Sequence, residues 1–90
     1  MAKAEISWKR TTSEGVRLQV YVQHVGRDWR FFARERRYDQ WQAVDEPPLE
    51  DWLELLDAVR RRINRRLLRP EEEGRVVKSI RERYPDAEFE

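Results

Sequence analysis

The sequence predicts an α+β domain in which a four-stranded antiparallel meander sheet is followed by two C-terminal helices packed on one face of that sheet (ββββαα). Three observations lead to this fold. The first half alternates apolar and polar residues, as half-buried strands do, and Gly26 lies in a short turn between two such segments. After Pro47-Pro48, apolar residues recur at helical spacing. The length of 90 residues predicts a single domain over residues 1–90.

The clearest strand is predicted over residues 16–25, and residues 29–36 continue the same alternation after the turn. Gly26 is the first of two central residues, as a type II′ hairpin requires. Folding about this turn predicts one face with the pairs Val22–Phe31, Val20–Ala33 and His24–Trp29, and a second face with Tyr21–Phe32 and Gln19–Arg34.

Two further strands are predicted at about 5–10 and 40–44. In the first, Ile6 and Trp8 point inward, and in the last, Trp41 and Ala43 do. The inward face is therefore expected to be apolar and to carry Ile6, Trp8, Leu18, Val20, Val22, Trp29, Phe31 and Trp41.

A sheet with one apolar face needs a cover, and two helices are predicted at about 48–68 and 70–84, with a tail at 86–90. The apolar stripe of the first helix consists of Leu49, Trp52, Leu53, Leu56, Val59, Ile63 and Leu67. The buried side of the second consists of Val76, Val77, Ile80 and Tyr84.

Composition argues against several classes of protein. There is no Cys, so disulfides and thiolate sites are excluded, and the N-terminus has no apolar stretch typical of a signal peptide. No apolar run approaches the length of about 18 residues that a membrane span needs. We therefore expect a cytoplasmic location without membrane contact.

Catalytic chemistry is not indicated. His24 is the one histidine, and its position opposite Trp29 predicts packing at a strand end. No cluster of His, Asp and Glu has metal-ligand spacing, and the three glycines form no phosphate-binding loop. We expect no catalytic residues, no metal and no cofactor, and thus a protein that is not an enzyme.

The charged residues are unevenly distributed although the net charge is only +1. Residues 38–57 contain seven acidic and no basic groups, whereas residues 58–70 contain six Arg and no acid. On a helix, an arc of about 140° would collect Arg61, Arg62, Arg65, Arg66 and Arg69. Such a ridge is either a solvated helix end that complements the dipole or a binding site for phosphate or carboxylate.

The outward face of the predicted sheet is a second candidate site. It collects Lys9, Arg17, Gln19, Tyr21, Gln23, Arg30, Phe32, Arg34 and Arg36. Aromatic rings among Arg and Gln are typical of surfaces that stack single-stranded bases and contact phosphates. Two other interpretations stay open: an ordinary cross-strand pair on a wet sheet face, or a contact with a partner protein or a second copy.

The stretch Gly26–Ile63, with GRDWRFFARERR, WQAV and PPLEDWLELLDAV, resembles Pur-type single-stranded nucleic-acid-binding domains. These have a strand bearing aromatics and Arg, a further strand and one amphipathic helix, and often dimerise. The resemblance covers under half of the chain and does not include the second predicted helix. It implies that Arg17, Tyr21, Arg30, Phe32 and Arg34 form the contacting face.

The leading hypothesis is a non-enzymatic domain that binds single-stranded DNA or RNA through this basic and aromatic sheet face. The candidate residues are Arg17, Tyr21, Arg30, Phe32 and Arg34, joined by Arg62, Arg65 and Arg66 of the Arg run. The alternative hypothesis is a protein-interaction or homodimerisation module, in which the Arg-rich helix docks on an acidic protein surface such as residues 45–57 of a second copy.

Overall fold

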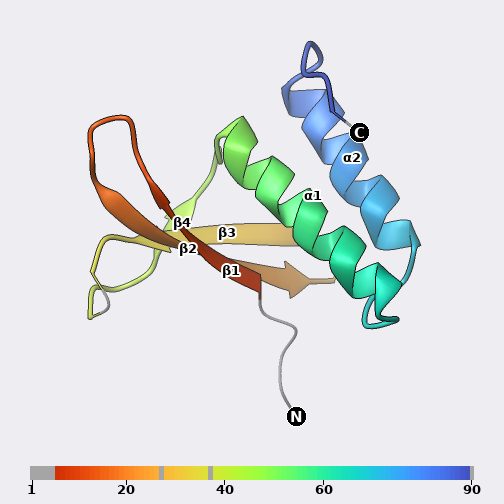
Figure 1. The fold of residues 1–90 in the computed structure, drawn as a ribbon, viewed down its shortest axis with the longest axis horizontal. Helices are drawn as coiled ribbons and strands as arrows, with labels where there is room; N and C mark the ends of the chain where they lie inside the picture. Colours follow the sequence, from red (N-terminus) through yellow and green to blue (C-terminus); the bar gives the residue numbers. More distant parts are fainter. Residues whose placement is uncertain (1–5, 27, 37, 90) are drawn as a thin grey trace. The chain divides into compact units, whose positions relative to one another are not determined.

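The computed structural model describes residues 6–26, 28–36 and 38–89. Within the described part, four strands are followed by two helices, as predicted (Figure 1). The chain consists of two compact units, residues 1–46 with the strands and residues 47–90 with the helices. The α+β class and the order of elements expected from the sequence are confirmed.

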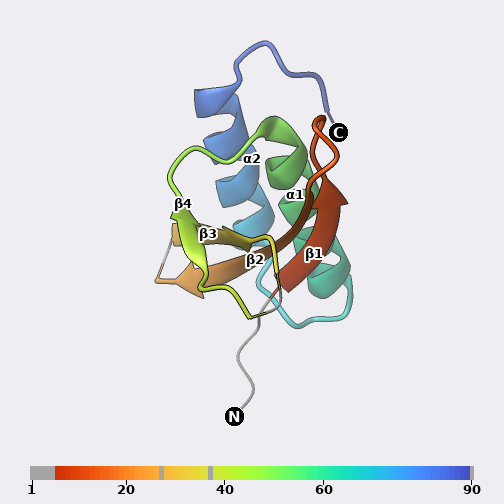
Figure 2. The same ribbon diagram turned by 90° about the vertical axis from the view of Figure 1, so that its left-hand side faces the viewer.

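The first unit is one antiparallel sheet with the strand order β1-β2-β3-β4. Figure 2 shows β1 and β4 at opposite edges, so each strand pairs with its neighbour in the sequence. This is the predicted meander. The strands are β1 Ile6–Thr11, β2 Arg17–Val25, β3 Asp28–Arg34 and β4 Gln42–Val44.

The register of β2 and β3 confirms all five predicted pairs. Tyr21 lies opposite Phe32, and His24 lies opposite Trp29. Gly26, in the connecting turn, has a φ of 61°, a left-handed value that glycine adopts without steric cost. Its partner in the predicted turn, Arg27, lies outside the described residues.

The fourth strand corrects the prediction for Trp41 and Ala43. Ala43 pairs with Phe32, and Val44 pairs with Phe31, so Ala43 shares the face of Phe32 and not the apolar face. Trp41 precedes β4 by one residue and contacts Tyr21 on that same outward face. The predicted strand began too early, at residue 40, because Gln40 and Trp41 lie outside any strand and the chain turns before them, where the Asp39 carboxylate accepts a 3.2 Å hydrogen bond from the Arg36 amide.

The most buried side chains of the sheet all belong to one face. They are Ile6, Val20, Val22 and Phe31, each at most 4% exposed. On the same face, the edge of Trp8 contacts Phe31 with ring centroids 6.4 Å apart. The alternation read from the sequence therefore assigns β1, β2 and β3 to the correct faces, and the error is confined to β4.

The second unit is a helical hairpin of α1 Leu49–Asn64 and α2 Glu71–Arg83. The two helices lie side by side and run in opposite directions (Figures 1 and 2). Arg60 of α1 donates to the Glu73 carboxylate of α2 at 2.8 Å. The buried apolar side chains of the helical hairpin are Trp52, Leu55, Leu56, Ala58, Val59, Val76 and Ile80.

Two predicted members of the helical stripes need correction. The predicted first helix includes Leu67, but this residue lies beyond the last residue of α1 and is 65% exposed. The predicted stripe does not include Leu55, but this side chain is fully buried. Tyr84 caps α2, and its hydroxyl donates to the Pro47 carbonyl at 2.8 Å. Residues 84–89 form no helix, in agreement with a tail beyond the second helix.

The end of α1 is four residues earlier than predicted and has the hydrogen bonds of a Schellman motif. The Leu67 amide donates to the Arg62 carbonyl at 2.8 Å, and the Arg66 amide donates to the Ile63 carbonyl at 2.9 Å. Arg66 has a φ of 62°, in the left-handed region where glycine is the usual residue. A β-carbon at this position is strained, so Arg66 lowers the stability of the helix end.

We expect Arg66→Gly to raise the free energy of unfolding by about 0.5–1 kcal/mol, because relief of the left-handed strain outweighs the entropy of glycine in the unfolded chain. Urea unfolding followed by circular dichroism at 222 nm measures the change. The matched control is Arg65→Gly, at a φ of −91°, which should lower stability. A loss of stability in Arg66→Gly as large as in Arg65→Gly would contradict the assignment.

Tyr84→Phe removes the hydroxyl that donates a hydrogen bond to the Pro47 carbonyl. It should lower the free energy of unfolding by about 1 kcal/mol, since a part-buried acceptor loses its partner. Thermal unfolding of the variant and the parent gives the difference. Tyr38→Phe is the control, because Tyr38 is 79% exposed and its removal should change stability by less than about 0.5 kcal/mol. Equal effects of the two changes would argue against a structural role for the Tyr84 hydroxyl.

Candidate nucleic-acid interface

The outer face of the sheet, defined as the face opposite Val20, Val22 and Phe31, carries one row of paired residues across all four strands. Ser7 pairs with Tyr21, Tyr21 with Phe32, and Phe32 with Ala43. Two rings thus occupy the middle of the row, and the small Ser7 and Ala43 occupy the ends. Both end residues are exposed, so no large side chain of this row stands beside the two rings.

A third ring joins them. Tyr21 stacks on Phe32 with centroids 5.2 Å apart and an interplanar angle of 26°, and Trp41 lies 4.9 Å from Tyr21 at 52°. These separations are those of favourable aromatic pairs. All three side chains, which we call the ring cluster, are only partly buried. The outer face therefore presents an accessible group of three contacting rings.

Arg34 is held against this cluster by three contacts. Its Nε donates to the Gln19 side-chain oxygen at 2.7 Å, and its Nη1 donates to the Asp39 carbonyl at 3.3 Å. The guanidinium lies 4.1 Å above the centroid of the Trp41 ring, within the range of a cation–π interaction. The orientation of the guanidinium is thus set by an amide oxygen, a backbone carbonyl and a ring.

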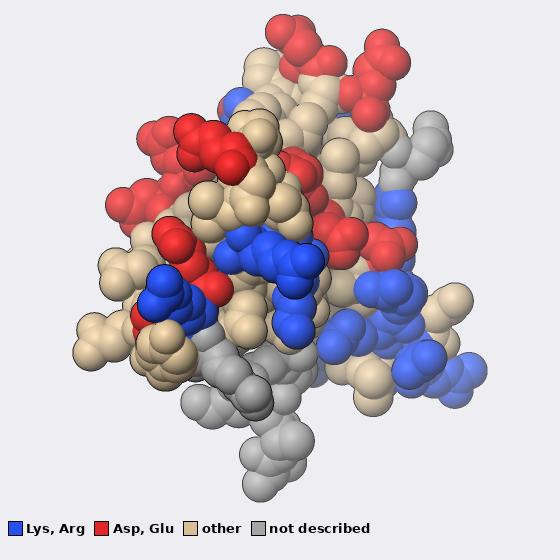
Figure 3. Space-filling model, turned by 60° about the vertical axis from the view of Figure 1, so that its left-hand side comes forward, with Lys and Arg blue, Asp and Glu red and all other residues tan. Residues whose placement is uncertain are grey.

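Three other cations of the outer face have no anionic partner in the part of the chain that the structure describes. Lys9 of β1, Arg17 of β2 and Arg30 of β3 are exposed, and none of them forms an ion pair with a described residue. Figure 3 shows that Lys and Arg side chains gather into groups on the face that it displays. The outer face thus combines partly accessible rings with exposed cationic groups.

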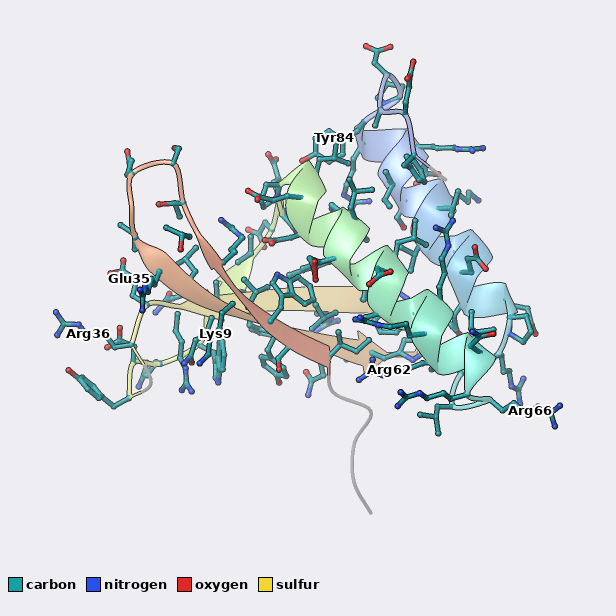
Figure 4. The ribbon with its side chains drawn as sticks, in the orientation of Figure 1. Lys9, Glu35, Arg36, Arg62, Arg66 and Tyr84 are labelled. Carbon is teal, nitrogen blue, oxygen red and sulfur yellow. The ribbon has the colours of Figure 1, made fainter. Side chains whose placement is uncertain are left out.

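A hollow of about 520 Å³ lies beside the ring cluster. Lys9, labelled in Figure 4, projects from β1 at this part of the sheet. The rings of Tyr21 and Trp41 and the cations Lys9 and Arg34 line this hollow. The neutral side chains of Ser7 and Gln19 and parts of the inner-face residues Trp8 and Val20 complete the lining.

The structure brings together five of the eight candidate residues. Arg17, Tyr21, Arg30, Phe32 and Arg34 all lie on the outer face.

The remaining three, Arg62, Arg65 and Arg66, do not form the helical ridge that the sequence predicts. Arg62 lies on α1 and donates to the Ala58 carbonyl at 3.5 Å, whereas Arg66 lies in the turn beyond the helix and points away from it (Figure 4). Arg65 is the C-cap residue, so the 100° spacing of a helix does not apply beyond it. Arg61, another member of that ridge, pairs with Asp57 at 3.3 Å.

Trp41 is the functional candidate that the sequence prediction placed on the wrong face. Its signal in the sequence is weak, because the seven residues between β3 and β4 leave the register of β4 open. The pair of Ala33 with Gln42 sets that register, which continues toward Arg34 and Trp41. Their cation–π contact is the result.

A catalytic, metal or membrane site would draw on the single histidine, the acidic residues or the helices. The His24 ring stacks on Trp29 with centroids 4.1 Å apart and planes within 9°, the packing expected from the sequence. Among the described residues, no group of three His, Asp or Glu side chains could hold a metal ion. In the same part of the chain, neither helix combines the length and apolar character that a membrane crossing demands.

Comparison of the chain with protein-family models, with curated proteins and with solved structures yields no match.

Arg34→Ala should lower the free energy of unfolding by about 1–2 kcal/mol, because it removes the hydrogen bond to Gln19 and the cation–π contact with Trp41 together. Arg36→Ala is the control, since Arg36 is exposed and its side chain donates to the exposed Tyr38 hydroxyl, while its backbone bond to Asp39 is kept. Urea unfolding of both variants measures the difference. If the two substitutions cost the same, the contacts of Arg34 contribute nothing to the sheet.

Proposed function

We propose that this protein binds single-stranded nucleic acid on the outer face of its sheet and is not an enzyme. The observation that carries the proposal is the ring cluster of Tyr21, Phe32 and Trp41, surrounded by cations on one accessible surface. Phosphates and unpaired bases are the chemical partners that such a surface suits.

The rings supply the stacking energy. A base stacked on an aromatic side chain contributes about 1–3 kcal/mol, with little dependence on its identity. Phe32 stacks on Tyr21 across one strand pair and faces the small Ala43 across the other. A base can therefore approach Phe32 from the side of Ala43 without displacing a large side chain.

The cations supply the attraction to phosphate. Lys9, Arg17 and Arg30 are exposed and without ion pairs to described residues, and Arg34 is fixed beside Trp41. Arg presents a planar fork that matches phosphate oxygens. The resemblance to Pur-type domains implies the same face, and it supports the proposal as an expectation from the sequence.

A contact with a protein or a second copy is the competing use of the same surface. Partly accessible rings suit that role too, and homodimers commonly bury aromatic patches. The two functions differ in their response to salt. Binding to phosphate releases counterions and weakens as salt rises, whereas a dimer built on rings persists.

The first test is a titration of short single-stranded and duplex oligonucleotides at several salt concentrations. The ring cluster predicts preference for the single strand, because only unpaired bases can stack on it. Four cations on the outer face predict that the logarithm of the affinity falls with the logarithm of the salt concentration with a slope of about −2 to −3. Sedimentation of the protein alone in low and high salt is run in parallel. Absence of binding at low salt, together with a dimer that persists in high salt, would replace the proposal by the competing function.

The second test locates the site. Phe32→Ala, Tyr21→Ala and Trp41→Ala should each weaken oligonucleotide binding by about 5- to 100-fold, because each removes a stacking ring. Tyr38→Ala is the matched control, since this ring is exposed and lies outside the ring cluster. Far-UV circular dichroism checks that every variant is folded.

A different outcome would move the site to the helical unit. Binding that is insensitive to the three ring substitutions but falls in Arg62→Ala and Arg65→Ala would place the nucleic acid at the end of α1.

A further inference from the structure

The hollow beside the ring cluster is large enough to hold more than a solvent molecule. Its volume of about 520 Å³ falls within the range of about 300–1,000 Å³ typical of pockets that bind small organic ligands. Its position on the outer face sets it beside the partly buried rings of Tyr21 and Trp41, which line it. A flat aromatic ligand can therefore lie against these rings within the hollow.

The polar groups of the lining are mainly hydrogen-bond donors. The Lys9 ammonium and the Arg34 guanidinium can only donate. Because Arg34 Nε donates to the side-chain oxygen of Gln19, the amide is oriented with that oxygen toward Arg34, and the Gln19 amide nitrogen is left as a further donor. No described residue accepts a hydrogen bond from this amide nitrogen.

These donors favour a particular ligand. Lys9, without an ion pair to a described residue, matches a phosphate, and the Gln19 amide matches a carbonyl oxygen on the edge of a base. Uracil and thymine carry two carbonyl oxygens, whereas the edge of adenine carries an amino donor in their place. The rings match the flat face of any base.

We propose that this hollow binds one nucleotide whose base bears carbonyl oxygens, with the base against Tyr21 and Trp41 and the phosphate at Lys9. This inference deepens the proposed function and rests on it for its biological setting. It predicts that the protein also binds a free nucleoside monophosphate, although more weakly than a strand that covers the rest of the outer face.

The experiment titrates ¹⁵N-labelled protein with UMP and with AMP and follows the backbone amide and side-chain signals. UMP should bind about three- to tenfold more tightly and should shift the Gln19 side-chain amide. Adenine has the larger ring and stacks better, so a preference for UMP reports hydrogen bonding. Equal or tighter binding of AMP would overturn the proposed base selectivity and with it the inference.

Ser7→Phe tests the position of the nucleotide, because the new ring fills the hollow from β1 while the ring cluster and the cations remain. We expect loss of UMP binding and about tenfold weaker oligonucleotide binding. Thr11→Phe is the matched control, on the same strand and the same face but outside the lining of this hollow. Lys9→Ala is a second variant, which should weaken UMP but leave uridine binding unchanged.

The outcomes separate this inference from the proposed function. If the parent binds oligonucleotides but not UMP, and Ser7→Phe binds them as tightly as the parent does, the hollow is not a nucleotide site and the proposed function still stands. If the parent binds UMP at the hollow but no oligonucleotide, the inference holds and the proposed function fails. Binding of neither ligand overturns both.

Discussion

The pairing of Tyr21 with Phe32 across β2 and β3 is the constraint on which the candidate site depends. Side chains alternate between the two faces of a strand, so a shift of β3 by one residue in this register would move Phe32 to the face of Val20 and Val22 and separate it from Tyr21. Gly26 supports the register because its left-handed backbone closes a short turn at low cost. The surface chemistry of the sheet thus follows from one local turn.

The outer face contains some side chains that are held in place by their neighbours and others that are free to move. Arg34 is held by Gln19 and by the face of Trp41, and the rings contact one another. Lys9 and Arg30, in contrast, are exposed and have no ion pair to a described residue. The fixed groups define a shape for flat ligands, and the exposed cations can adapt to the varied positions of phosphates on a flexible strand. This combination is the physical basis of the proposed function.

The sequence predicts the β2–β3 hairpin pair by pair because a two-residue turn leaves a single register. It does not predict the face of Trp41, because seven residues separate β3 from β4 and the last strand has only three. Hydrophobicity misleads there, since a tryptophan is expected inside. The end of α1 is missed for another reason. Arg66 adopts a left-handed backbone without being glycine, so the usual stop signal is absent from the sequence, and apolar Leu67 continues the helical spacing.

The central claim is that single-stranded nucleic acid contacts the ring cluster, and the four tryptophans allow a direct measurement. Their indole N–H signals can be assigned by substitution and followed by NMR while a short single-stranded oligonucleotide is added. The account predicts that the signal of Trp41, on the outer face beside Tyr21, shifts strongly. The signals of Trp29, on the opposite face, and of Trp52 in α1 should move little. Saturable shifts of these two signals with an unchanged Trp41 would contradict the account.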